Sequence, residues 1–472
     1  MKVVIAGAGL VGPLLALFLR RRGYEVHLHE RRSDAQTVES RRSINLVITS
    51  RGIHALNELG LWSEAKNLTV SVRGRMIHSL KGDLAFQPYG RDDNECNYSI
   101  SRLELNSFLL KKAAEAGVKI EFDSRLTSVD LKSRVCTFET AVSHASPRAT
   151  QYDLFFAADG AGSVARHALE RAGATQVQTD WLDTDYKELA IPKNLGAKMD
   201  LHALHIWPRG THMMMALPNT AGDFTVTLYL PRAHHEWSFE SLRTEADIKK
   251  LFQSQFSDAL DLIPNYLEDF MKNPQGRLGT VRASTWIYED SFCLIGDAAH
   301  AIVPFFGQGM NLGFEDCTTL ATILDRAPKN NQQSNQQNNV KNKNLWAHAL
   351  NEFDSIQRPN ANAIAAMALD NFIEMRDRVG QAQFQLKKKI EARIEHEFPE
   401  LYRSRYAMVT YTLIPYKLAQ EAGRIQSEIL EELALTATSS DDVDLKVARN
   451  LIEQKLTPFY QKHGLTTARF AP

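Results

Sequence analysis

A glycine-rich turn directly after the first predicted strand constrains the fold of this chain most strongly. Gly7-Ala8-Gly9-Leu10-Val11-Gly12 matches the pattern GxGxxG, between the β-branched run of residues 2–6 and an apolar, helix-like segment over residues 13–22. A second predicted strand over residues 24–29 is followed by Glu30. GxGxxG alone is a weak signal, but this order of strand, turn, helix, strand and acidic residue is typical of a βαβ dinucleotide-binding unit.

Each residue of this motif has a physical task. Gly7 permits the tight turn, Gly9 lets a pyrophosphate approach the backbone, and Gly12 lets the helix pack closely on the strand. The helix N-terminus offers free N–H groups and partial positive charge to phosphates. Glu30 would accept hydrogen bonds from ribose hydroxyls, and its charge disfavours a 2′-phosphate. The motif therefore predicts bound FAD or NAD rather than NADP.

Two later motifs favour FAD over NAD. Asp159-Gly160, with Arg166 six residues after the glycine, follows a predicted strand over residues 154–157. Gly296-Asp297 follows another strand and leads to Gly307-Gln308-Gly309-Met310-Asn311. Asp297 is placed to accept from a ribityl hydroxyl, and the helix that opens at residues 307–311 could stabilise negative charge on a reduced flavin ring. An NAD dehydrogenase has no use for either element.

The sequence predicts an α/β fold in which a Rossmann-like FAD-binding domain is interrupted by a mostly antiparallel β substrate domain and followed by a helical C-terminal region. Strand-like runs separated by Pro, Gly and Asn between about residues 186 and 230 indicate the antiparallel part. The low-complexity run "NNQQSNQQNNVKNKN" is nearly devoid of apolar groups and predicts a disordered loop. The predicted boundaries are 1–180 and 286–327 for the FAD-binding domain, 181–285 for the β domain, 328–344 for the loop and 345–472 for the helical region, with Pro359 at a kink or helix start.

Composition excludes several classes of protein. Fifty-five Lys and Arg against 56 Asp and Glu give a net charge of -1, without the basic excess of a nucleic-acid-binding protein. No apolar run approaches the roughly 20 residues of a membrane-spanning helix, and no signal peptide precedes residue 2. The four cysteines are far apart, which suggests neither a disulfide framework nor a metal site. We therefore expect a soluble, cytoplasmic protein without a transmembrane anchor, nucleic-acid partner or metal.

The three motifs together resemble those of the single-component, class A FAD-dependent aromatic hydroxylases. Longer runs are similar to the kynurenine 3-monooxygenase family within that class. They include "RRSINLVITSRG" (41–52), "RGRMIHSL" (73–80), "QPYGRDD" (87–93), "GDAAHAIVPFFGQGMN" (296–311), "NFIEMR" (371–376) and "YAMVTY" (406–411). The resemblance extends to about residue 420. Mitochondrial members of the family carry a C-terminal membrane segment, and this chain resembles the soluble form without it.

The resemblance implies an activity and a set of site residues. The implied reaction is hydroxylation of L-kynurenine to 3-hydroxykynurenine with O2 through a C4a-hydroperoxyflavin, a step of tryptophan catabolism, with tightly bound FAD and with NADPH as co-substrate. Arg75, Tyr89, Asn371 and Tyr406 would bind the substrate's amino-acid end, and Phe305, Phe306 and Met375 would form walls around its ring. FAD contacts would come from Gly7, Gly9, Val11, Gly12, Glu30, Arg31, Arg42, Val47, Arg102, Leu126, Asp159, Asp297, Gly309, Met310 and Asn311.

Other interpretations stay open at this point. A hydroxylase of the same class could act on another aromatic or phenolic acid, and a flavoprotein could oxidise or reduce lipids without inserting oxygen. A non-catalytic NAD-binding or scaffold protein would purify colourless. For the hydroxylase we expect no acid or base side chain in catalysis, because the aromatic amine of kynurenine already donates electron density into the ring. A homodimer is among the partners considered.

Overall fold

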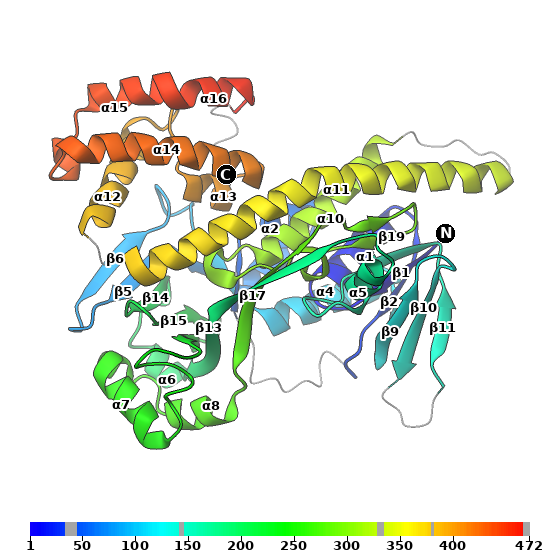
Figure 1. Ribbon diagram of the computed structural model, residues 1–472, viewed down its shortest axis with the longest axis horizontal. Coiled ribbons are helices and arrows are strands. Elements are labelled where there is room, and N and C mark those ends of the chain that lie inside the picture. The colour runs from blue at the N-terminus through cyan, green and yellow to red at the C-terminus, as the bar shows by residue number, and fades with distance from the viewer. Residues whose placement is uncertain (34–44, 141–145, 328–334, 379–381, 466–472) are drawn as a thin grey trace.

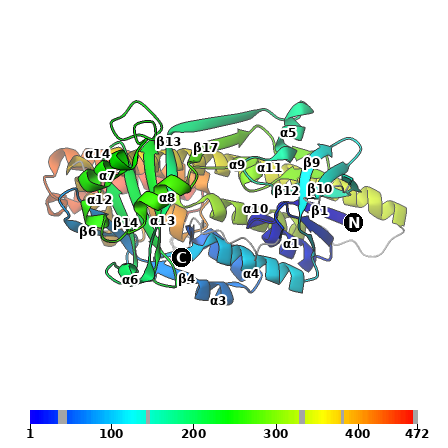
Figure 2. The same ribbon diagram turned by 90° about the horizontal axis from the view of Figure 1, so that it is seen from below.

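The computed structural model describes residues 1–33, 45–140, 146–327, 335–378 and 382–465. Two large sheets lie at opposite ends of the molecule, and the long helix α11 (Asn335–Ile373) runs across both (Figure 1). Figure 2 shows the same two lobes side by side, with the N-terminus in the first and the C-terminal helices beside the second.

The first sheet confirms the predicted dinucleotide-binding topology. Its order is β18-β19-β12-β1-β2-β8, with every pair parallel except β18–β19. The bounds are β1 Lys2–Ala6, β2 Glu25–His29, β8 Lys119–Glu121, β12 Leu154–Ala157, β18 Ile287–Tyr288 and β19 Phe292–Leu294. All four residues of β12, Leu-Phe-Phe-Ala, are buried, as expected for a parallel strand covered on both faces.

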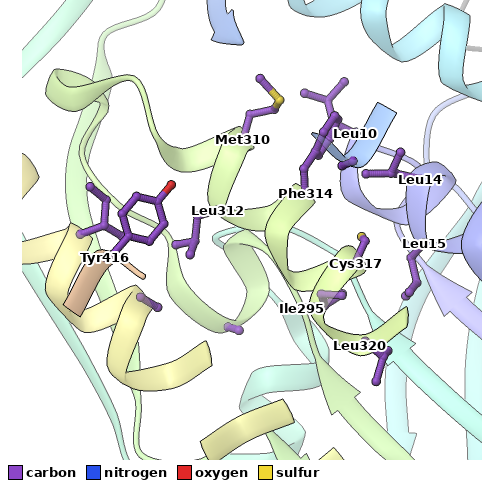
Figure 3. Close-up of a cluster of buried hydrophobic side chains, with 14 of the residues drawn as sticks. Leu10, Leu14, Leu15, Ile295, Met310, Leu312, Phe314, Cys317, Leu320 and Tyr416 are labelled. Carbon is purple, nitrogen blue, oxygen red and sulfur yellow. The ribbon is translucent and has the colours of Figure 1, made fainter. Parts of the chain in front are cut away.

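Helices α1 (Val11–Arg21), α4 (Arg102–Glu115) and α10 (Gly309–Arg326) pack together beside this sheet. Pro13 stands in the first turn of α1, where its missing N–H costs nothing. Gly23 follows the helix with φ +84°, a conformation that favours glycine. In the core between α1 and α10, Leu14 and Leu15 lie beside Phe314, Cys317 and Leu320 (Figure 3).

The second sheet is mostly antiparallel, as predicted, but it recruits a hairpin from outside the predicted insertion. Its order is β17-β13-β16-β15-β14-β5-β6. The bounds are β5 Gly74–His78, β6 Leu84–Pro88, β13 Val177–Ile191, β14 Ala203–Pro208, β15 Met213–Pro218, β16 Phe224–Pro231 and β17 Gly276–Ala283. Strand β5 pairs in parallel with β14, so residues 74–88 join this sheet although the predicted boundary left them in the first domain. That pairing joins segments about 130 residues apart in the sequence, so no pattern within either segment predicts it.

A separate apolar core lies under the second sheet. Trp207, Phe224 and Leu228 pack there against Ile248 and Phe252 of α7 (Glu245–Gln255). A capping box between Thr244 and Asp247 begins α7, and α8 (Tyr266–Lys272) follows it. The short helix α6 (Lys193–Gly196) closes the turn between β13 and β14.

Two three-stranded sheets complete the β structure. The order β11-β10-β9 joins Arg148–Gln151, Val135–Thr140 and Ser124–Asp130, and the order β3-β7-β4 joins Asn45–Ile48, Asn97–Ser101 and Thr69–Val72. The remaining helices of the first 327 residues are α2 (Ser50–Glu58), α3 (Trp62–Ala65), α5 (Val164–Arg171) and α9 (Asp297–His300), with short turns η1 (Lys66–Leu68), η2 (Ser257–Ala259) and η3 (Pro304–Phe306).

The C-terminal region is helical, as predicted, but its start differs from the prediction. Residues 328–334 of the predicted Asn/Gln-rich loop lie outside the described residues, whereas from Asn335 onward the chain is already in α11. Once a helix is nucleated, each added residue costs little, so a polar segment can extend a helix that is anchored elsewhere. Pro359 lies inside α11 and not at its start.

The later helices pack around α11 and α14. They are η4 (Glu374–Arg378), α12 (Ala382–Glu397), α13 (Arg405–Tyr411), α14 (Tyr416–Thr436), η5 (Ser440–Asp442), α15 (Leu445–Leu451), η6 (Ile452–Leu456) and α16 (Thr457–Lys462). Across the described ranges, no helix combines the length and the apolar composition needed to cross a bilayer.

Candidate functional site

The predicted nucleotide motifs meet at one edge of the first sheet. Gly7 follows β1, Glu30 follows β2, Asp159 follows β12, and Asp297 follows β19 by way of Ile295 and Gly296. These four strands are neighbours and run parallel, so their carboxyl ends lie together. This is the edge at which open α/β sheets bind ligands.

The glycine turn has the shape that a pyrophosphate requires. Gly7 has φ +100°, and a Cβ there would lie 2.2 Å from the carbonyl oxygen of Ala158; a Cβ on Gly12 would lie 2.0 Å from that of Gly7. At Gly9, in contrast, a Cβ would meet no protein atom within 4 Å. The glycines at the two ends are therefore needed by the fold, whereas the middle glycine faces open space where a ligand can approach the backbone. The chain thus fits a dinucleotide here.

Glu30 is buried and already bonded within the protein. Its Oε2 accepts from the Ala8 backbone N–H at 2.9 Å, and its Oε1 accepts from the backbone N–H and Nε of Arg32 at 3.0 and 2.9 Å. Burial alone would raise the pKa of Glu30, but the bonds from Arg32 and Ala8 lower it, so the carboxylate stays charged. A ribose bound at Glu30 would share this carboxylate with the glycine turn.

Two residues outside the predicted set hold the same edge together. Asn106 of α4 donates to the carbonyl oxygens of Ala8 and Gly9 at 2.9 and 2.6 Å. Arg166 of α5 donates to the carbonyl oxygens of Ala298 and Ala161 at 2.9 and 2.5 Å. Arg166 belongs to a motif visible in the sequence, whereas nothing local distinguishes Asn106 from other polar residues of a helix.

Asn311 fixes the loop at the start of α10. Its Oδ1 accepts from the Thr49 N–H at 2.9 Å, and its Nδ2 donates to the carbonyl oxygens of Val47 and Gly307 at 2.8 and 2.9 Å. The side chain is fully buried and both ends of its amide are occupied. Any contact of Asn311 with FAD would therefore use its backbone, while its side chain ties residues 47–49 to the loop.

Replacement of Asn311 by Asp should loosen this loop. A carboxylate cannot donate, so it would face the carbonyl oxygens of Val47 and Gly307 without hydrogen bonds. We expect a loss of about 3 kcal/mol in the free energy of unfolding and weaker FAD retention. Urea denaturation and the ratio of flavin to protein absorbance measure both effects, and unchanged values in N311D would contradict this role.

A buried ion pair supports the turn before Asp297. His300 Nε2 lies 2.7 Å from Asp316 Oδ2, which also accepts from the Gly296 N–H at 2.9 Å. Gln357 of α11 donates to Asp316 Oδ1 at 3.1 Å. Burial alone would lower the pKa of His300, but Asp316 raises it above its ordinary value of 6.5. The pair joins α9, α10 and α11 behind the edge that carries the motifs.

The pKa of His300 predicts a pH-dependent contribution to stability. Because the folded pKa is raised, protonated His300 stabilises the fold fully below pH 6.5, and this contribution is lost as the pH rises through the folded value. Wild type should exceed H300Q in unfolding free energy by about 2 kcal/mol at pH 6, with a smaller difference at pH 9. Urea denaturation at both values tests this, and a pH-independent difference would contradict it.

The other predicted FAD residues differ in their surroundings and exposure. Val11 begins α1 and packs against Gly296 and Gly313, and Leu126 is buried in β9. Arg31, Arg102 and Asp297 are exposed, whereas Val47 and Gly309 are half-buried. Asp159 accepts from the Ala165 N–H at 3.2 Å, and Met310 is buried in the first turn of α10. Arg42 lies outside the described residues.

Three of the four polar residues predicted to bind substrate come together from segments that are distant in the sequence. Arg75 of β5 donates from Nε to the Tyr89 hydroxyl at 3.4 Å, and its guanidinium lies 5.4 Å from the centre of the Tyr89 ring. Tyr89 stacks on Tyr406 of α13 with ring centres 5.4 Å apart and planes at 18°. Tyr406 also stacks on Phe306 at 5.7 Å and 21°. We call Arg75, Tyr89 and Tyr406 the polar clamp.

Aromatic side chains continue from the polar clamp into the protein. Phe305 packs against Phe372 of α11 with ring centres 4.3 Å apart and against Tyr229 of β16 at 5.1 Å. Asn371 donates to the carbonyl oxygen of Phe305 at 2.5 Å and to the Met375 sulfur at 3.5 Å. The side-chain amide of Asn371 therefore stabilises the turn that contains Phe305, and the Met375 side chain that it contacts is buried.

The charges of the polar clamp are fixed by their surroundings. Burial alone would lower the pKa of Arg75, but Tyr89, Tyr406 and Glu374 raise it above its usual value, so the guanidinium remains protonated. Burial raises the pKa of both Tyr89 and Tyr406, so both phenols remain neutral. The arrangement presents a cation and phenolic hydroxyls beside an aromatic wall, which suits an aromatic molecule with an anionic end.

Comparison with known proteins decides the family. Residues 1–336 match the family model described as an FAD binding domain. The kynurenine 3-monooxygenase of Myxococcus xanthus (strain DK1622) is 42% identical over 98% of this chain and 97% of its own length. The chain belongs to the kynurenine 3-monooxygenase family. That of Xanthomonas axonopodis pv. citri (strain 306) is 40% identical over 98% of both chains. The predicted family, FAD as cofactor and flavin-dependent monooxygenase class are thereby confirmed.

Solved structures confirm the fold class. A 2-methyl-3-hydroxypyridine-5-carboxylic acid oxygenase in its tetrameric form aligns with a TM-score of 0.63 and 18% identity over 80% of this chain and 93% of its own. The tetracycline destructase Tet(51) aligns with a TM-score of 0.58 and 17% identity over the same shares. At such identities the likeness concerns the fold alone.

Proposed function

We propose that this protein hydroxylates L-kynurenine to 3-hydroxykynurenine, with NADPH as the reductant and O2 as the source of the inserted oxygen. One atom of O2 would enter the ring, the other would leave as water, and NADPH would be oxidised to NADP⁺. The observation that carries the proposal is the polar clamp beside Phe305 and Phe306. The names of the relatives support the same substrate.

The polar clamp suits the amino-acid end of kynurenine. The charged Arg75 guanidinium can bind a carboxylate through parallel N–H bonds, and the neutral phenols of Tyr89 and Tyr406 can donate to the same group. Glu374, the first residue of η4, raises the pKa of Arg75, and it also lies 3.9 Å from Lys388 Nζ. A zwitterion bound at Arg75 would therefore place its ammonium group near a carboxylate that is shared with Lys388.

The rest of the proposed substrate is an aromatic ring that carries an amine and a ketone. Phe305 and Phe306, with Met375 behind them, provide a wall against which the ring can pack, and aromatic pairs add about 1 kcal/mol beyond their buried area. The amine on the kynurenine ring is neutral near pH 7 and activates the neighbouring ring position. The protein's task is therefore to orient the ring and exclude water, and we propose no acid or base side chain.

FAD would be held by the glycine turn, Glu30 and the start of α10, and when bound it supplies the electron transfer and oxygen activation that protein side chains lack. The N-terminal end of α10 presents backbone N–H groups and a positive dipole end, which suits negative charge on a flavin ring. Asn311 keeps this helix start in place through Thr49 and Val47.

The direct test is NADPH oxidation by the purified yellow protein with and without L-kynurenine, with product analysis. We expect strong stimulation and one 3-hydroxykynurenine per NADPH. Stimulation that yields only peroxide would show that kynurenine binds as an effector but is not hydroxylated. Higher turnover with a phenolic acid such as salicylate would assign the enzyme to another substrate of the same class.

A further inference from the structure

A buried ion network joins the loop after Tyr89 to the segment before Tyr406. Arg403, whose side chain is fully buried, donates from its two terminal nitrogens to Glu95, at 2.8 Å to Oε1 and 3.3 Å to Oε2. The same guanidinium donates to Glu395 Oε1 at 3.0 Å. Glu95 is 308 residues from Arg403 in the sequence, so this contact attaches two distant segments.

Glu95 also closes its own loop. It accepts from the backbone N–H of Arg91 at 3.0 Å and from the Arg91 guanidinium at 2.8 Å. A Cβ on Gly90 would lie 2.1 Å from the Cβ of Glu95, so the loop is folded tightly on itself. Tyr89 immediately precedes this loop, and its backbone N–H donates to the carbonyl oxygen of Arg73 at 2.9 Å. Tyr89 is thereby fixed on both sides.

A second contact joins the same two segments. Asn97, two residues after Glu95, donates from Nδ2 to the Tyr406 hydroxyl at 3.0 Å. Tyr406 lies three residues after Arg403, in the first turn of α13, which Ser404 caps by accepting from the Ala407 N–H. Ser404 in turn donates its backbone N–H to Glu395 at 3.2 Å, so the start of α13 is bound to the ion network through both Arg403 and Ser404.

We propose that Glu95 and Arg403 are positioning residues that set Tyr406 against Tyr89 and so keep the polar clamp ready for substrate. The choice of kynurenine as the ligand rests on the proposed function, whereas the positioning of Tyr406 does not. Burial alone would raise the pKa of Glu95, while Arg403 and Arg91 lower it, so the carboxylate remains charged. A buried ion pair is weak evidence for stability, because apolar side chains of similar volume often serve as well; the role proposed for this pair is to specify geometry.

The test compares Glu95→Gln with a matched variant elsewhere. E95Q keeps the shape of the side chain and removes its charge. Asp290→Asn removes the carboxylate of a less deeply buried ion pair, Asp290 with Arg134, on the turn between β18 and β19. Titration of the FAD-loaded enzyme with L-kynurenine, followed in the flavin spectrum, gives the dissociation constant of each. We expect about tenfold weaker binding in E95Q, less than twofold change in D290N, and normal FAD content in both.

A second readout is independent of the substrate. With 3-fluorotyrosine incorporated, the ¹⁹F resonance of Tyr406, assigned by its loss in Y406F, reports the ring environment. It should shift or broaden in E95Q and stay unchanged in D290N. Arg403→Lys keeps the positive charge but loses the contact of two nitrogens with Glu95, so it should move the same resonance and serves if E95Q does not fold.

Wild-type binding and an unchanged Tyr406 resonance in E95Q would overturn the inference. If the wild-type protein binds no kynurenine, the proposed function fails, while the resonance still decides whether Glu95 and Arg403 position Tyr406. A lower melting temperature in E95Q with unaltered binding and resonance would assign the network to stability alone.

Discussion

A Gly12→Ala variant is expected to purify without bound FAD and with a weakened fold. The added Cβ would lie 2.0 Å from the carbonyl oxygen of Gly7 and 3.3 Å from Cδ1 of Leu28. A backbone carbonyl cannot move aside as a flexible side chain can, so α1 must shift away from β1 and β2. Overpacking of this kind costs about 1–3 kcal/mol, and the shift also displaces the N–H groups that would hold the pyrophosphate.

Gly9→Ala is the matched control for this effect. Its Cβ meets no protein atom within 4 Å, so the apoprotein should melt at the wild-type temperature. FAD retention should nevertheless fall, because the methyl group occupies the approach of the pyrophosphate. The ratio of flavin to protein absorbance and the melting temperature of the apoproteins separate the two cases. A yellow G12A with wild-type stability would contradict the steric argument.

Arg75→Ala is expected to weaken L-kynurenine binding by roughly ten- to 150-fold while FAD stays bound. A charge-assisted hydrogen bond contributes about 1.5–3 kcal/mol, and each 1.4 kcal/mol is a factor of ten in affinity. The loss is large here because the guanidinium is the positive group of the polar clamp, beside the Tyr89 hydroxyl and ring. Arg75→Lys should recover only part of the affinity, since an ammonium lacks the planar fork.

Arg73→Ala is the control for a general loss of positive charge. Arg73 lies two residues earlier, its side chain is 49% exposed, and it lies 3.6 Å from Asp93. Exposed ion pairs contribute little, so this variant should bind kynurenine within twofold of wild type. Dissociation constants from flavin-spectrum titrations make the comparison. Equal losses of kynurenine affinity in R73A and R75A would show that long-range positive charge, rather than contact with Arg75, attracts the substrate. Wild-type affinity in R75A would show that Arg75 does not bind the substrate.

Local sequence was sufficient for the nucleotide-binding unit. The strand, the turn from Gly7 to Gly12 and α1 occur as predicted because their spacing and apolar pattern act over short range. The prediction for Glu30 was incomplete: its carboxylate also bonds to Ala8 and Arg32, and GxGxxG patterns contain no signal for that contact. Asn106 was missed for the same reason, since it reaches the turn from nearly 100 residues away.

Contacts between distant segments could not be predicted from periodicity. The parallel pairing of β5 with β14 and the stack of Tyr89 on Tyr406 each join parts of the chain that no local rule connects. Arg75 and Tyr406 were identified only through the family resemblance, because alone each is an ordinary charged or half-buried residue. The start of α11 at Asn335 was also not predicted. There, a polar run that would be disordered alone extends the helix formed by the residues that follow it.

The proposed function depends on insertion of oxygen from O2 into L-kynurenine. Turnover with NADPH and L-kynurenine under ¹⁸O2, with mass spectrometry of the product, tests this step. We expect 3-hydroxykynurenine that carries one ¹⁸O atom, in an amount that matches the NADPH consumed. Hydroxylated product without the label, or consumption of NADPH with unmodified kynurenine, would contradict it.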